Sequence, residues 1–471
     1  MNLISAYKSL FPEAFRNRVA SVPFVQSWRN GVLVAEGKRL SSEIRASRQK
    51  NDYKIRVTLM EARRGFWLNH ASIYEAMEKD PDFEVHVLAV PKRMPAGEMD
   101  WDEYVRLLEF FDGEGIPCQR AYEMKTQRWM NPLSFGLPDV VFLPHPYDFQ
   151  QNYMYGSGYW KRFCKVAFLS YGLTINSFPF IFHAPCYDNC SFLFMDSEAH
   201  RNLFAELSPE HTEKLIVTGH PSLDAYLRPF QSLRHWPFKS PQSTRRIIWA
   251  PHFTIAANKT EHHFSNFFTY FETFIRLAKA HPELEIVLRP HPELFNLMVS
   301  SGLKSRKAAM DYRTRFGALP NAWICEDADY ISLFRQSDAL ILDSISFIGA
   351  YAPTGKPLCF LESAKRERLN SMGERLLHAN YAAWDDRELL DFVESVVLGG
   401  DDYLKNERAA VVKKVLYMPQ EGAGLRIACE LKNRLKPECF DGSGKSKCGH
   451  ALPLCRQTTG KGREPCEAFS M

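Results

Sequence analysis

The stretch Glu285-Ile286-Val287-Leu288-Arg289-Pro290-His291-Pro292 joins a short apolar run to a stiff polar loop. The apolar run, residues 285–288, predicts a buried strand because it is short and ends at a proline-containing turn. The two prolines stiffen the turn around His291, and Arg289 adds a fork of donors suited to phosphate oxygens. Open α/β sheets bind ligands at the carboxyl ends of their strands, where backbone N–H groups and helix dipoles favour anions. The stretch therefore predicts an α/β fold with an anion site at this loop.

Comparable short motifs recur along the chain at the ends of other apolar runs. They are Gly219-His220-Pro221-Ser222-Leu223-Asp224, Ala250-Pro251-His252-Phe253, Asp343-Ser344-Ile345-Ser346 and Gly355-Lys356-Pro357. One such loop is common in α/β proteins. Several in series indicate a nucleotide- or phosphate-handling transferase.

These motifs supply the candidate site residues. We expect Arg289 and His291 to act in catalysis, Arg289 as a phosphate ligand and His291 as a proton donor or acceptor. The residues expected to bind the donor are Ser344, Ser346, Asp343, Lys356, Gly219, His220, Pro251 and His252. The acceptor-side candidates also follow apolar runs, and they are His145, Tyr171 and Gly172. Simpler roles stay open for the same residue types: a structural histidine, a serine that only caps a helix, or a lysine exposed to solvent.

Strand-like and helix-like segments alternate in two successive series, separated by a break that contains Pro237 and Pro241. The first series begins with a predicted strand over 55–60, and the second contains predicted strands over 247–250, 285–288, 339–342 and 358–361. Such alternation predicts parallel sheets covered on both faces. The expected fold is α/β, with two Rossmann-like domains facing a central cleft. The expected parts are a basic helical segment over 1–50, an acceptor-side domain over 51–236, a nucleotide-donor domain over 237–400, C-terminal helices over 401–436 and a disordered tail over 437–471.

Charge is distributed unevenly, although the 471 residues carry a formal net charge of only +4, too small to indicate nucleic acid binding. Residues 1–50 contain nine Lys/Arg and three Asp/Glu, and residues 431–471 contain eight and four. Removing these net charges of +6 and +4 from the total leaves −6 for the residues between them. Basic ends could dock on an anionic membrane surface or polymer, or they could be solvated arms.

Several protein classes are disfavoured by motifs that the sequence lacks. No apolar run approaches the ~20 residues of a membrane span, and the first residues do not resemble a secretion signal. The expected location is therefore cytoplasmic, with possible peripheral binding to the inner face of the membrane. Walker A, G-x-G-x-x-G, G-x-S-x-G and H-E-x-x-H motifs are absent, so we expect no dinucleotide cofactor. The tail cysteines form no C-x-x-C pair, and we expect no metal.

The motif series resembles the CDP-glycerol glycerophosphotransferase family, which makes teichoic-acid-like polymers and capsule parts on a GT-B fold. The family pattern runs G-x-P-R-x-D, A-P-T-F, R-x-H-P, D-Y-S-S and K-R-P, and the five motifs follow that order over about residues 130–365. The resemblance implies that a CDP-linked alcohol binds near Arg289, His291, Ser344 and Ser346. It also implies inline attack on phosphorus by a hydroxyl of a polymer or lipid-linked acceptor.

The chain also departs from the family pattern. The family's W-H-G motif, whose histidine is thought to act as the base, has its best counterpart in Ser170-Tyr171-Gly172, which lacks a histidine. Ser222 stands where the family has arginine, and Ile345 where it has tyrosine. Two alternatives stay open: a GT-B glycosyltransferase that uses a nucleotide sugar for surface polysaccharide, and a catalytically lapsed GT-B binding protein.

Overall fold

The computed structural model describes residues 39, 42, 53–94, 97–170, 172–228, 236, 245–255, 265–326, 329–363 and 369–436. The expected basic segment over 1–50, apart from Arg39 and Ser42, lies outside these residues. So do the expected tail over 437–471 and most of the break between the two series. No helix in the described ranges is both long and apolar enough to cross a membrane.

Seven parallel strands form the first sheet, in the order β3-β2-β1-β6-β7-β8-β9. Their bounds are β1 (Ile55–Glu61), β2 (Phe83–Ala89), β3 (Cys118–Arg120), β6 (Val140–Phe142), β7 (Lys165–Leu169), β8 (Phe192–Met195) and β9 (Leu215–Val217). A small antiparallel pair, β4 (Tyr122–Glu123) and β5 (Arg128–Trp129), projects from this half. The central strands are short apolar runs because helices cover both faces of the sheet and leave no face for water.

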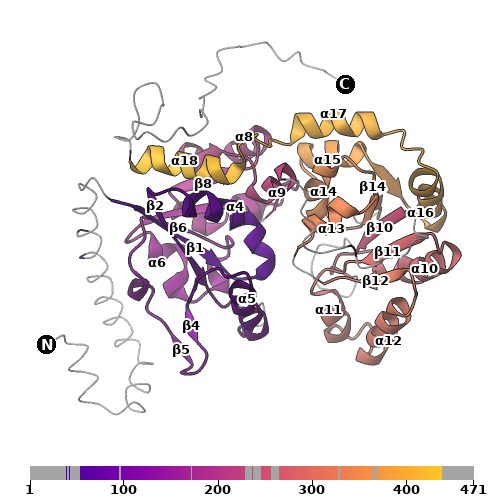
Figure 1. Cartoon of the computed structure of the whole chain (residues 1–471), viewed down its shortest axis with the longest axis horizontal. Helices are drawn as coiled ribbons and strands as arrows, with labels where there is room; N and C mark the ends of the chain where they lie inside the picture. The colour runs from indigo at the N-terminus through magenta and orange to yellow at the C-terminus, as the bar shows by residue number, and fades with distance from the viewer. Residues whose placement is uncertain are drawn as a thin grey trace, which may run out of the picture.

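Six parallel strands form the second sheet, in the order β12-β11-β10-β13-β14-β15. Their bounds are β10 (Arg245–Ala250), β11 (Leu284–Leu288), β12 (Ala322–Ile324), β13 (Ala339–Leu342), β14 (Leu358–Leu361) and β15 (Tyr381–Ala383). Every residue of β11, β13 and β14 is buried. The fold class expected from the sequence is confirmed: two Rossmann-like halves, seen side by side in Figure 1.

Helices cover the two sheets. The first half contains α4 (Trp67–Glu78), α5 (Trp101–Gly113), α6 (Ser157–Trp160), α7 (Pro179–Phe182), α8 (Glu198–Leu207) and α9 (Asp224–Leu227). The second half contains α10 (Phe267–Ala280), α11 (Leu294–Ser300), α12 (Arg306–Gly317), α13 (Ile331–Gln336), α14 (Ser346–Tyr351), α15 (Ser371–His378) and α16 (Asp386–Asp391).

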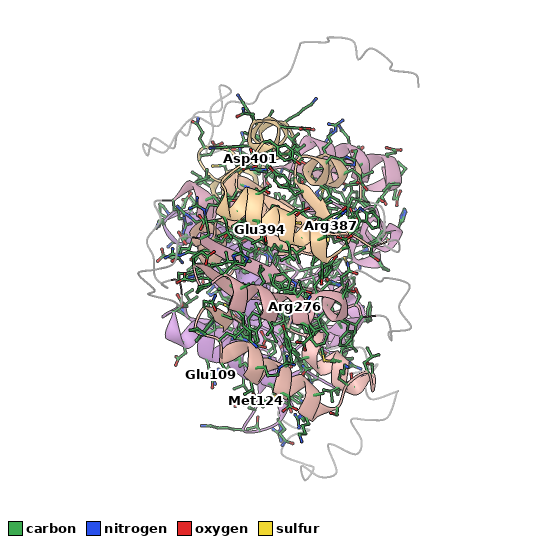
Figure 2. All side chains as sticks on the ribbon, turned by 90° about the vertical axis from the view of Figure 1, so that its right-hand side faces the viewer. Glu109, Met124, Arg276, Arg387, Glu394 and Asp401 are labelled. Carbon is green, nitrogen blue, oxygen red and sulfur yellow. The ribbon has the colours of Figure 1, made fainter. Side chains whose placement is uncertain are left out.

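The outer helices of the second half each have a buried apolar side and a charged outer side. Phe274 of α10 and Leu389 of α16 are completely buried against the sheet. Arg276 and Arg387 of the same two helices lie on the outer face in Figure 2, and Arg276 pairs with Asp386 at 2.7 Å. One apolar stripe and one charged face are what a helix covering a sheet requires.

The C-terminal segment returns to the first half. It forms α17 (Lys405–Val415) and α18 (Ala423–Leu435), which lie over different halves in Figure 1. Pro419 and Gly422, the latter at φ 91°, interrupt the helical pattern between them. The carboxylate of Asp224 accepts the N–H groups of Ala423 and Gly424 at 2.8 and 2.9 Å, which anchors the start of α18. Residues 416–422 are therefore a connection that carries the chain from one half to the other.

Strand order determines where loops can meet a ligand. In each sheet the chain first adds two strands on one side of its first strand and then adds the remaining strands on the other side. The two strands that flank this reversal are β1 and β6 in the first sheet, and β10 and β13 in the second. Loops at the carboxyl ends of such strands diverge and leave a crevice between them. Each half therefore presents one crevice.

Candidate functional site

A cavity of about 610 Å³ opens between the two halves, at the carboxyl ends of both sheets. Its walls come from the loops that follow β1, β6 and β7 in the first half and β10, β11 and β13 in the second. Both crevices therefore contribute to one site. A volume of this size is typical of small-molecule pockets.

The cavity brings together several of the expected residues. Its lining includes Pro251, Arg289, His291 and Ser344 from the second half, and Gly172 from the first. Tyr171 lies outside the described residues. Ser346 is the first residue of α14, directly beyond the lining residue Ile345. The loop at 289–292, on which the sequence prediction centred, is a wall of this cavity.

His291 presents one ring nitrogen as a donor. Its backbone N–H donates to the carbonyl of Pro251 at 3.1 Å, and its Nδ1 accepts the N–H of Glu293 at 3.2 Å. Accepting at Nδ1 leaves the hydrogen of the neutral ring on Nε2. Burial lowers the pKa of His291 well below its usual value, and nearby positive charge lowers it further. His291 is therefore a neutral donor at the cavity wall.

Arg289 lies against an aromatic wall. Its guanidinium carbon is 5.8 Å from the ring centres of both Tyr330 and Phe347, and Nη1 lies 3.7 Å from Sγ of Cys325. The Arg289 backbone N–H donates to the carbonyl of Trp249 at 2.7 Å, which holds the loop against β10. A guanidinium stacked in this way keeps its charge and its planar set of donors.

The sequence prediction missed most of the positive charge at the site. The lining contains five arginines, Arg63, Arg64, Arg106, Arg289 and Arg313, against two glutamates, Glu103 and Glu326. A sequence signal existed for Arg63 and Arg64, because Ala62-Arg63-Arg64-Gly65 directly follows β1, the predicted first strand. Arg106 and Arg313 lie on helices and carried no such signal. The cavity is suited to an anionic ligand.

Arg63 links the two halves across the cavity. Its Nη2 lies 3.6 Å from a carboxylate oxygen of Asp100 in the first half and 3.5 Å from one of Glu293 in the second. Burial and the charge of Arg63 together lower the pKa of the neighbouring Lys92 to about 8. The residues around His291 therefore include basic groups from the opposite half.

His145, an acceptor-side candidate, lies behind the wall that Pro146 and Tyr147 form. Its exposed fraction is 2%, and its Nδ1 accepts the N–H of Tyr147 at 3.2 Å. Nε2 is buried and has no hydrogen-bond partner among the described residues. Burial, with the charges of Lys92 and Arg63, lowers the pKa of His145 to about 3. His145 is thus a second neutral histidine close to the cavity.

Asp343 and His252, both expected to bind the donor, do not line the cavity. The Asp343 carboxylate is completely buried and accepts the N–H groups of His252 at 2.6 Å and Asn266 at 2.5 Å. Nδ1 of His252 lies 2.8 Å from Oγ1 of Thr254. Burial raises the pKa of Asp343 to about 7. These contacts hold the loop after β10 against the end of β13.

His220 and Gly219 also lie away from the lining. Nε2 of His220 donates to the carbonyl of Ser170 at 2.8 Å, and its Nδ1 lies 2.7 Å from Oγ of Ser222. Both ring nitrogens therefore make contacts within the protein. Gly219, at φ 82°, was expected to bind the donor. Instead, a Cβ built there would lie 2.8 Å from Cδ of Pro419, so the close neighbour is the C-terminal connection.

Lys356 is neither exposed nor directed at the cavity. Its Nζ donates to the carbonyls of Arg335, at 2.8 Å, and Ser337 at the end of α13. A lysine in this position satisfies carbonyls that the last turn of a helix leaves unpaired.

The fold has counterparts among solved structures. No protein-family model matches the sequence, and no curated protein matches it. S. aureus MnaA, in a co-structure with UDP, superposes with a TM-score of 0.54 at 13% identity, covering 81% of this chain and 97% of that one. A putative UDP-N-acetylglucosamine 2-epimerase from Listeria monocytogenes gives 0.54 at 14% identity, with 82% and 97% covered. A variant of the wall teichoic acid polymerase TagF, soaked with CDPG, gives 0.54 at 12% identity, with 88% and 99% covered.

The chain has the GT-B fold. Its two halves meet at the cavity just described, and the likeness extends over more than four fifths of the chain. At these identities the likeness concerns the fold alone. Within the described part of the chain, no group of three His, Cys, Asp or Glu side chains could hold a metal ion.

Proposed function

We propose that this GT-B protein transfers an alcohol phosphate, glycerol or ribitol phosphate, from a CDP-linked donor to a hydroxyl of a polymer or lipid-linked acceptor. The observation that carries the proposal is the arginine-rich cavity between the two crevices, with Arg289, His291 and Ser344 on its second-half wall. The order of the sequence motifs supports the same donor. Structures of this fold that hold UDP or were soaked with CDPG add support for a nucleotide-linked ligand.

In the proposed reaction, the acceptor oxygen attacks the phosphorus that bears the alcohol. A new P–O bond forms, the bond from that phosphorus to the bridging oxygen breaks, CMP leaves, and one proton is released. The protein contributes mainly position and charge, as in other phosphoryl transfers. Arg289 would neutralise negative charge, and Nε2–H of His291 would donate to a phosphate oxygen. Such pre-aimed donors typically contribute a few kcal/mol each.

His145 would support the acceptor side from behind the wall formed by Pro146 and Tyr147, because it does not itself line the cavity. Its Nδ1 is occupied by the Tyr147 N–H, so the neutral ring carries its hydrogen on Nε2. In this arrangement the ring can donate a hydrogen bond but cannot take a proton at Nε2. The proposal therefore assigns no general base to His145, which agrees with the lack of a W-H-G histidine in the chain.

The second candidate is a nucleotide-sugar enzyme. It would use the same cavity and the same phosphate ligands, and the likeness to MnaA and to the putative epimerase is as strong as the likeness to TagF. The third candidate is a lapsed enzyme that no longer binds a nucleotide-linked ligand and serves as a binding or assembly partner. The five arginines at the cavity weigh against it, because a site with no anionic ligand would gain nothing from gathering them.

Calorimetric titration of the whole protein with CDP-glycerol, CDP-ribitol, CMP and UDP- and GDP-sugars, without added metal, tests the proposal. We expect a cytidine ligand to bind selectively and Arg289→Ala to weaken that binding about tenfold or more. Arg306→Ala, an exposed arginine of α12 outside the cavity lining, is the control. Preference for a UDP- or GDP-sugar would move the protein to the second candidate, and no binding at all would favour the third.

A further inference from the structure

A second group of cavity arginines lies apart from the aromatic wall that holds Arg289. Arg64 donates to the carboxylate of Glu103 through its backbone N–H at 3.0 Å and through its side chain at 3.3 Å. Arg106 lies one helical turn after Glu103 on α5 and also lines the cavity. Arg106 is exposed and makes no ion pair or hydrogen bond with the described residues. The first half thus places one paired and one unpaired guanidinium on the same side of the cavity.

The second half completes this group. Arg313 of α12 binds Glu326 with two parallel hydrogen bonds, at 2.7 and 3.0 Å, and its guanidinium lies 4.8 Å from the ring centre of Phe295. The charge of Arg106 acts on Glu326 across the gap between the halves. Three cations therefore face two anions, and the excess charge is positive.

This group and Arg289 belong to one continuous cavity. Arg289 contacts Sγ of Cys325, and Arg313 binds the next residue, Glu326. A transferase of this kind must hold two molecules at once, so two sets of cations in one cavity can serve two anionic groups. A planar guanidinium donates two parallel hydrogen bonds to a phosphate as readily as to a carboxylate. Glu103 and Glu326 would then hold Arg64 and Arg313 in place until an anion arrives.

We propose that Arg64, Arg106 and Arg313 form a second anion subsite that binds a phosphate group of the acceptor. The acceptor then carries at least one phosphate group. This inference rests on the proposed function only in assuming that the protein binds an acceptor. The subsite stands on the contacts of the three arginines and does not require the donor to be CDP-linked.

The test uses a synthetic glycerol phosphate trimer as the probe and whole protein saturated with CMP, with binding followed by calorimetry. We expect the trimer to bind without displacing CMP. Arg106→Gln and Arg313→Gln should each weaken trimer binding about tenfold while CMP affinity stays unchanged. Arg306→Gln, on the same helix as Arg313 but outside the lining, should change neither affinity.

Glu326→Gln separates binding from a structural role of the Arg313 ion pair. If the pair only stabilises the fold, this variant loses stability and gains no affinity. If Arg313 binds phosphate, removal of the competing carboxylate should tighten trimer binding several-fold. Circular dichroism spectra would show whether each variant keeps its fold, and Arg106→Gln breaks no pair within the described residues.

Besides that outcome for Glu326→Gln, three results would overturn the subsite: failure of the trimer to bind, competition between trimer and CMP, or unchanged trimer affinity in both Arg106→Gln and Arg313→Gln. Failure of the proposed function has a different signature. In that case CMP and CDP-alcohols do not bind, yet the trimer still binds the free protein in a manner that depends on Arg106 and Arg313.

Discussion

At the scale of single residues, the contacts of each histidine distinguish site residues from structural ones. His291 and His145 each use Nδ1 to accept a backbone N–H from two residues ahead, which leaves Nε2 to carry the hydrogen. His220 uses both ring nitrogens inside the protein. A proline follows each of these three histidines, so sequence pattern alone treated them alike.

Replacing His291 with alanine tests its role as a donor. We expect kcat to fall about 10²–10³-fold, because one pre-aimed donor to a charged transition state is lost. Turnover of CDP-glycerol with an acceptor primer would be measured, together with the circular dichroism spectrum. His378→Ala, an exposed histidine of α15, is the matched control. Full activity in His291→Ala would remove this residue from the mechanism.

We predict that the buried carboxyl group of Asp343 makes the stability of the folded protein depend on pH. Burial raises its pKa to about 7, so between pH 4 and 7 the folded protein holds a proton that the unfolded chain has released. Stability should therefore decrease as the pH rises through this range, by an amount on the order of a few kcal/mol. Asp343→Asn lacks this titration. Its deficit in the free energy of unfolding, relative to the wild type, should therefore be largest near pH 4 and smaller at pH 8. Urea unfolding of both proteins at the two pH values measures the deficit, and a constant deficit would contradict the prediction.

At the scale of elements, the sequence predicted the central strands well and missed short ones near the edges. Apolar runs identified β1, β10, β11, β13 and β14 to within about a residue or two. β12 and β15 have only three residues each, and Trp323 in β12 is half exposed, so neither shows a clear apolar run. β8 (Phe192–Met195) is fully buried and could have been found from its apolar run.

Gly219 tests the packing of the C-terminal connection on the first half. Gly219→Ala would combine a strained backbone, at φ 82°, with a Cβ 2.8 Å from Pro419 and 3.0 Å from the Tyr417 carbonyl. Gly115→Ala is the control, because Gly115 has φ 68° with open space around it and tests the backbone strain alone. Strain of this kind costs about 1–2 kcal/mol per residue. We expect Gly219→Ala to lower the unfolding temperature clearly more than Gly115→Ala, and equal losses would mean that the contact with Pro419 adds nothing.

At the scale of the whole molecule, the two halves are joined by more than the connecting chain. Tyr226 donates to the carbonyl of Ala350 at 2.7 Å, and Asn370 donates to the carbonyl of Thr174 at 2.7 Å. The Arg63–Glu293 pair adds a charged contact at the cavity. We propose that each sheet with its helices is one domain, with boundaries near those expected from the sequence, and that α18 belongs to the first.

The basic N-terminal residues predict binding to membranes. Residues 1–50 carry a net charge of +6, and each basic residue near an anionic surface contributes about 1 kcal/mol. We expect the full chain to sediment with phosphatidylglycerol vesicles and to be released by salt, and a chain lacking residues 1–50 to stay in solution. Phosphatidylcholine vesicles are the control. Equal sedimentation of the truncated chain would refute a membrane role for this segment.

The sequence by itself determined the alternation of strands and helices and the loop that carries Arg289 and His291. Apolar periodicity and proline turns act over a few neighbouring residues and can be recognised without knowing the rest of the fold. Tertiary structure alone decided that Arg63 and Arg64 after β1, Arg106 on α5 and Arg313 on α12 face one cavity. It also directed the side chains of Lys356 and Asp343 to backbone groups of the protein and away from the cavity. Strand order and burial are set by contacts between residues far apart in the chain, and no local pattern encodes which loops will meet.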